Sequence, residues 1–194
     1  MPAPRSIALF PLNIVLFPGG PLPLRIFETR YVDMVRNCMR GDQRFGVVLI
    51  REGSEVGPAE TFEVGTTAKI VDFHQLSDGF LGLSCIGEQR FRIESRSRQA
   101  DGLNVAQIDW IAVEPKIAVP QRHARLAELL KTVLPQLGEV YVGMEMHLSD
   151  AAWVGHRLAE ILPIDPAEKQ FCLELEDPIE RLDVLSPLAQ GQAN

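Results

Sequence analysis

Short apolar-rich stretches occur throughout the first 115 residues of the chain, and Gly and Pro residues separate them. Short runs bounded by such breakers are typical of β-strands. The pattern predicts six strands, at residues 7–10, 22–27, 45–50, 63–76, 80–93 and 103–113. Six short strands within so few residues predict a small β-barrel.

The clearest turn is Ser77-Asp78-Gly79, which lies between the fourth and fifth predicted strands. Because Gly adopts a positive φ at little cost, this turn predicts a tight hairpin in which Ser77 pairs with Phe80. In that register His74 would lie opposite Leu83, and Cys85 would lie opposite Asp72.

One helix interrupts the strands, at residues 29–40. Apolar side chains recur there with the spacing of a single helix face, at Tyr31, Met34, Val35, Cys38 and Met39. Gly41 follows directly and is predicted to cap the helix in the left-handed conformation.

After Pro115 the apolar period becomes helical. The spacing predicts an amphipathic helix from Pro120 that Pro135 bends or ends, and a second helix from Ser149 that Pro163 stops.

Two further helix starts have the same sequence signature, an Asp followed by Pro and, two residues later, Glu. These are Asp165-Pro166 and Asp177-Pro178, where Asp suits the N-cap and Pro the first helical position. The sequence therefore predicts an α+β protein. A barrel subdomain is expected at 1–115, a helical subdomain at 116–188 and a frayed tail at 189–194.

The chain carries a net charge of -7, and the excess lies near its end. Residues 1–144 hold 16 acidic and 16 basic side chains, whereas residues 145–194 hold 10 acidic and 3 basic ones. An acidic surface repels phosphate, so neither nucleic acid nor an anionic membrane is the expected partner.

The three cysteines are far apart, each among apolar neighbours, and predict buried thiols rather than a disulfide or zinc framework. The first residues hold no apolar run of leader length, and no stretch of about 18 apolar residues occurs. A cytoplasmic location is expected.

Three blocks resemble the Lon amino-terminal (LON) domain family. Residues 11–35, PLNIVLFPGGPLPLRIFETRYVDMV, look like its opening strand, Phe-Pro-Gly turn, second strand and helix. Residues 63–93, EVGTTAKIVDFHQLSDGFLGLSCIGEQRFRI, are similar to its Val-Gly-Thr strand, hairpin and Gly-x-x-Arg-Phe element. Residues 157–185, RLAEILPIDPAEKQFCLELEDPIERLDVL, look like its helical end.

This resemblance implies a PUA-like barrel followed by a small helical bundle. It also implies a non-catalytic module that binds unfolded or client polypeptides, with a protease or chaperone machine as a further candidate partner. The Gly-x-x-x-x-Gly-Lys-Ser/Thr phosphate loop of the full protease is missing, so neither ATP hydrolysis nor proteolysis is expected. No metal or nucleotide cofactor is expected either.

Catalytic alternatives centre on Ser84 and Cys85. The segment Gly82-Leu83-Ser84-Cys85-Ile86-Gly87 has the wrong spacing for a nucleophile elbow and lies within a strand rather than at a strand-to-helix turn. His74 could reach Cys85 only across a diagonal of the hairpin. The other histidines lack ligand spacing such as His-Glu-x-x-His.

Two binding surfaces remain open. An apolar surface at Leu76, Phe80 and Leu81, beside the hairpin turn, is the candidate for polypeptide. The alternative is an RNA-binding barrel, a comparison that rests on fold analogy. It would use four arginines whose even spacing places them on one face of a strand, Arg90, Arg92, Arg96 and Arg98.

Overall fold

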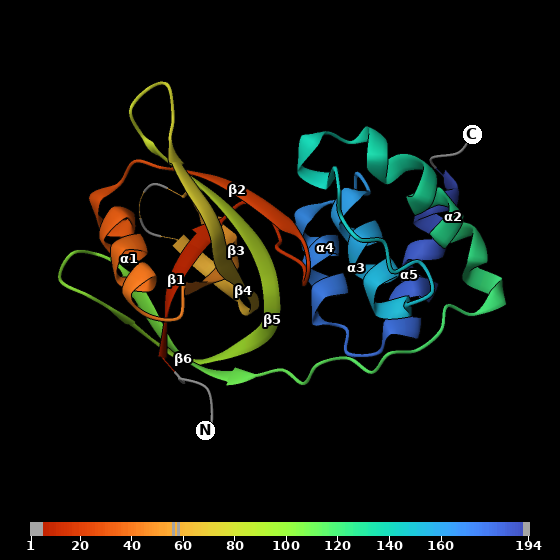
Figure 1. The fold of residues 1–194 in the computed structure, drawn as a ribbon. Helices are drawn as coiled ribbons and strands as arrows, with labels where there is room; N and C mark the ends of the chain where they lie inside the picture. Colours follow the sequence, from red (N-terminus) through yellow and green to blue (C-terminus); the bar gives the residue numbers. More distant parts are fainter. Residues whose placement is uncertain (1–5, 56, 58, 192–194) are drawn as a thin grey trace. The chain divides into compact units, whose positions relative to one another are not determined.

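The computed structural model describes residues 6–55, 57 and 59–191 (Figure 1). The chain divides into two compact units, Met1–Ala112 and Val113–Asn194. The first holds strands and one helix and the second holds helices, so the predicted α+β class is confirmed.

All six predicted strands are present in the first unit. They are β1 (Ser6–Leu12), β2 (Pro21–Ile26), β3 (Arg44–Gly53), β4 (Ala59–Gln75), β5 (Leu81–Arg98) and β6 (Asn104–Trp110). The helix between β2 and β3 is α1 (Thr29–Arg40), with the predicted bounds.

The strands form a six-stranded sheet in the order β2-β5-β4-β3-β1-β6, and β6 also pairs with β5. Five strands therefore close a ring, as predicted for a barrel. β2 remains outside the ring, because β5 pairs with β2 through residues 81–86 and with β6 through residues 91–98. The long β5 thus belongs to two sheet regions.

Successive side chains of a strand point to opposite faces of the sheet. In β1 and β3 the side chains on both faces are buried. Leu9 and Val48 belong to one apolar cluster, together with Phe91. Phe10 and Val47, their chain neighbours, belong to a second cluster. The helix α1 covers this second cluster with Tyr31, Met34 and Val35, the first residues of its predicted apolar face.

The end of α1 differs from the prediction. Gly41 has φ -115°, outside the left-handed region, and its N–H donates to the carbonyl of Cys38. The left-handed residue is Gln43, with φ 62°, whose N–H donates to the same carbonyl. The left-handed residue therefore lies two positions after Gly41, where it was predicted.

The second unit contains four α-helical and 3-10 segments up to residue 141 and three α-helices after it. These are η1 (Gln121–His123), α2 (Ala124–Val133), η2 (Leu134–Gln136), η3 (Glu139–Tyr141), α3 (Ala151–Ile161), α4 (Pro166–Glu174) and α5 (Pro178–Gly191). Pro135 ends α2 as predicted, because it lies in the 3-10 turn that follows.

Two helix starts follow from their caps. α3 begins two residues after the predicted Ser149, because the carboxylate of Asp150 accepts from the N–H of Ala152. α4 begins with the predicted capping box of Asp165 and Glu168. α5 continues through Gly191, so its helix includes the first part of the tail that was expected to fray; residues 192–194 lie outside the described residues.

No helix in the described part of the chain has the length and apolar character that crossing a membrane requires.

Candidate functional site

The most exposed aromatic side chains of the first unit gather at the β4–β5 hairpin. β3 pairs with β4 only as far as Lys69, whereas β5 pairs with β4 as far as Gln75. The end of β4 and the start of β5 therefore project as a hairpin, with β2 along the outer edge of β5 (Figure 1).

The hairpin register differs by one residue from the prediction. Gln75 pairs with Leu81, so residues 76–80 form a five-residue loop. Within this loop the N–H of Leu76 donates to the carbonyl of Phe80 over 2.8 Å. Gly79 supplies the positive φ of 87°, as expected of it. The predicted pairing of Ser77 with Phe80 is wrong because the loop is longer than a two-residue turn.

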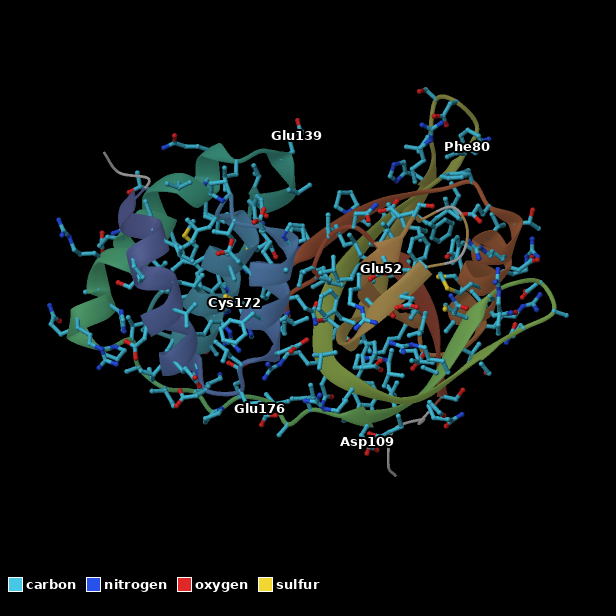
Figure 2. The ribbon with its side chains drawn as sticks, turned by 180° about the vertical axis from the view of Figure 1, so that it is seen from behind. Glu52, Phe80, Asp109, Glu139, Cys172 and Glu176 are labelled. Carbon is cyan, nitrogen blue, oxygen red and sulfur yellow. The ribbon has the colours of Figure 1, made fainter. Side chains whose placement is uncertain are left out.

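Phe80 and Phe27 form an aromatic contact at the hairpin tip (Figure 2 labels Phe80). Their ring centroids lie 6.2 Å apart at an interplanar angle of 72°. The guanidinium of Arg25 lies 4.7 Å from the Phe80 ring centroid, and its Nη2 pairs with Asp78 Oδ2 over 2.9 Å. We call Phe27, Phe80 and Arg25 the aromatic patch.

The patch is open to solvent. Phe27 is 54% exposed and Phe80 39%, and Phe73 on the same hairpin is 57% exposed. Edge-to-face geometry and a guanidinium over one ring fix the orientation of these side chains. Exposed apolar groups gathered in this way are typical of interaction surfaces.

Of the three side chains predicted for polypeptide binding, only Phe80 belongs to the patch. Leu76 and Leu81 are half-buried, and Leu81 packs against the core of the unit. Their role in binding stays a prediction.

Phe27 was not predicted as a contact, although the alternation along residues 22–27 contains the signal. Leu22 and Ile26 are buried, so the residues at odd positions face the opposite side of the strand, Phe27 and Arg25 among them.

The strand edges beside the patch are protected against pairing with another strand. Pro21 and Pro23 lie in β2, at the end of the sheet order, and lack the N–H that a further strand would need. On β4 the register shifts at Val71, and the N–H of Phe73 donates to the Asp72 carboxylate over 2.8 Å. Such edges disfavour the addition of another strand.

The arginines of β5 do not form one exposed face. Arg90 is only 3% exposed. Here β5 is an interior strand, because Arg90 pairs with Thr66 of β4 on one side and its carbonyl accepts from the N–H of Ile111 on the other. Arg92, Arg96 and Arg98 are exposed.

Two of the exposed arginines already have partners. Arg96 Nη1 pairs with Glu63 Oε1 over 2.8 Å, and its Nη2 donates to Thr61 Oγ1 over 3.0 Å. Arg98 Nε donates to the carbonyl of Gly102 over 3.2 Å. Phe91 is fully buried, so it provides no stacking surface for a base.

The thiol of Cys85 lies in the core, and burial raises its pKa to about 12. Its partner across the strands is Ile70 rather than Asp72, because β4 has an extra residue at Val71. His74 lies over Gly82, where an added Cβ would come within 2.7 Å of its ring. The structure therefore holds Cys85 as a protonated packing residue without a general base arranged beside it.

Comparison with known proteins gives a consistent result. Residues 6–190 match the family of the ATP-dependent protease La (LON) substrate-binding domain. The chain is 30% identical to Lon protease 2 of Myxococcus xanthus over 95% of its length, and 28% identical to Lon protease of Escherichia coli strain K12 over 96%. It spans 23% and 25% of those two proteins.

Solved structures agree. The crystal structure of a Lon N-terminal domain protein from Xanthomonas campestris has a TM-score of 0.78 and 37% identity, covering 94% of this chain and 97% of that one. The N-terminal domain of Lon protease from the Mycobacterium avium complex shares the fold, with a TM-score of 0.68 and 15% identity over 96% of this chain and 98% of that one. Since the family match covers nearly all described residues, the chain belongs to the Lon substrate-binding domain family.

Proposed function

We propose that this chain binds exposed segments of other polypeptides through the aromatic patch. The observation that carries the proposal is the pair Phe27 and Phe80, held in contact and yet open to solvent. Aromatic side chains are enriched at the energetic centres of protein interfaces, and Arg accompanies them there. The family's description as substrate-binding supports the same conclusion.

The bound segments are unfolded or partly unfolded clients. Folded proteins bury most of their large apolar side chains, whereas unfolded ones expose them. Because Pro21, Pro23 and the Asp72 cap disfavour strand addition, we propose that client side chains, rather than the client backbone, supply most of the contact.

We further propose that the chain performs no chemistry on its clients and acts with a protease or chaperone machine. The two Lon proteases compared above are roughly four times as long as this chain, which supports a link to proteolysis. The three cysteines are free thiols, which favours the reducing cytoplasm as its location.

A fluorescence anisotropy titration tests the proposal. The probe is fluorescein-labelled α-lactalbumin that has been reduced and carboxamidomethylated, so that it cannot refold. We expect the wild-type chain to bind this probe and not native α-lactalbumin, and the substitution Phe27→Ser to weaken binding about tenfold, as loss of an interface aromatic does.

The matched control is Phe171→Ser on α4, because Phe171 is the same residue type and is 52% exposed, against 54% for Phe27. Equal loss of binding in the two variants would contradict the proposal.

Salt separates this function from RNA binding. Apolar contacts persist as salt rises, whereas phosphate contacts weaken steeply. Arg90 is buried and Arg96 is paired, so few arginines of β5 remain for phosphate. Binding of single-stranded RNA that is tighter than client binding, and is lost with added salt, would favour the RNA alternative.

A further inference from the structure

A pocket of about 160 Å³ opens beside the aromatic patch, entirely within the first unit. Its lining includes Arg25 and Phe27, which are also members of the patch. Contact with a client at the patch therefore continues directly into the pocket.

The pocket has an apolar floor and a charged rim. Phe10, Leu12 and Tyr31 line it and are almost fully buried, whereas Glu55 is exposed. A concave site with apolar walls and a few polar groups near its mouth is the usual form of a binding pocket.

Aromatic packing keeps the floor rigid. The rings of Phe10 and Tyr31 lie 4.1 Å apart at 30°, and the Arg30 guanidinium lies 4.6 Å from the Tyr31 ring centroid. Arg30 is in turn fixed by Glu28, with a nitrogen-to-oxygen distance of 2.8 Å. The floor is therefore formed before a ligand arrives, which lowers the cost of binding.

The charges of the lining limit what can enter. Arg25 is paired with Asp78 and Glu28 with Arg30, so Glu55 makes the rim negative. Burial raises the pKa of Tyr31, so its phenol remains neutral and adds no charge. An acidic side chain would meet an apolar floor and a negative rim, so it is disfavoured.

The volume limits the size of the occupant. An engineered apolar cavity of about 150 Å³ in another protein holds one benzene molecule. A pocket of 160 Å³ is thus large enough for one phenyl or isobutyl group and too small for a folded element.

We infer that this pocket receives one phenylalanine or leucine side chain of a bound client segment. This inference rests on the proposed function and adds to it a requirement for a large uncharged residue at one position of the client. Alanine would leave the pocket unfilled, and aspartate would be rejected by charge and by the apolar floor.

The test uses the full 194-residue chain, labelled with ¹⁵N, and four small probes. These are the N-acetyl amides of phenylalanine, leucine, alanine and aspartate. We expect the phenylalanine and leucine probes to shift the amide signals of Leu24, Phe27 and Tyr31 saturably, and to bind at least about tenfold more tightly than the alanine probe.

Two variants block the pocket. Leu24→Trp fills it from β2, and Glu55→Trp covers it from the exposed rim, so that one remains informative if the other unfolds. The control is Ile14→Trp, which adds the same ring at an exposed site of the same unit outside the lining. Both blocking variants should abolish the probe-induced shifts, and the control should retain them.

The outcomes also separate this inference from the proposed function. Equal binding of all four probes, or shifts that persist in both folded blocking variants, would overturn the inference. If unfolded α-lactalbumin still bound in that case, the proposed function would stand without the pocket. Saturable, blockable probe binding in a chain that ignores unfolded α-lactalbumin would support the pocket and contradict the proposed function.

Discussion

At the scale of single residues, a group of buried polar contacts in the second unit converges on Glu114. Arg181 donates to both Glu114 oxygens, over 2.8 and 2.7 Å, and His156 Nε2 lies 3.3 Å from Glu114 Oε1. The side chains of all three are almost fully buried. No sequence motif joins these residues, because they come from three distant segments that meet only in the folded chain.

This cluster predicts that stability depends on pH in the acid range. Burial alone would raise the pKa of Glu114, but the hydrogen bonds and charges of His156 and Arg181 outweigh it and lower the pKa to about 2. Because the folded pKa is below the ordinary 4.5, the stabilisation is present above pH 4.5 and is lost as the pH falls towards 2.

The substitution Glu114→Gln tests this expectation. It leaves the buried Arg181 without a carboxylate and should lower the free energy of unfolding near neutral pH by about 3 kcal/mol. Urea unfolding followed by circular dichroism should show the difference between wild type and variant shrinking as the pH falls below about 4. Parallel pH profiles for the two proteins would refute the assignment.

At the scale of elements, the Phe-Pro-Gly-Gly turn after β1 is attached to the middle of β5. The N–H of Gly19 donates to the carbonyl of Gly87 over 2.7 Å, and the N–H of Gly87 donates to the carbonyl of Gly20 over 2.9 Å. A Cβ at Gly87 would lie 2.2 Å from the carbonyl oxygen of Phe17. Two of the sequence blocks that carry the family resemblance thus meet at one contact between backbones.

We therefore expect Gly87→Ala to destabilise the first unit by about 2 kcal/mol or more, because the added Cβ would force apart the backbones of Gly87 and Phe17. Gly41→Ala is the control, since its φ is negative and its added Cβ would meet nothing closer than 3.8 Å. That change should cost much less stability than Gly87→Ala, because the added methyl group has room. Thermal unfolding measures both, and a Gly87→Ala variant as stable as Gly41→Ala would contradict the contact.

The elements were largely predictable because their signals are local. Short apolar-rich runs between Gly and Pro residues placed all six strands, and the Asp-Pro-x-Glu pattern placed the starts of α4 and α5. The errors arose where a local signal competes with packing. Gly41 did not form the left-handed cap. The longer hairpin loop moved the β4–β5 register by one residue, and the extra residue at Val71 moved it by one more.

At the scale of the whole molecule, a sequence reveals which residues are apolar but not which remain exposed after folding. Phe80 was predicted as a contact from its place beside a turn, whereas Phe27 joins it only because β2 pairs with β5. The pocket was not predictable for the same reason, since its lining comes from β1, β2, α1 and the chain after β3.

The central claim is that the aromatic patch is the surface that touches clients. The most direct measurement is a titration of the ¹⁵N-labelled full chain with unlabelled, reduced and carboxamidomethylated α-lactalbumin, read from amide chemical shifts. The largest changes should fall at residues 25–28 and 76–82, around Phe27 and Phe80. Changes confined to the arginines of β5, or to the helices of the second unit, would contradict the claim.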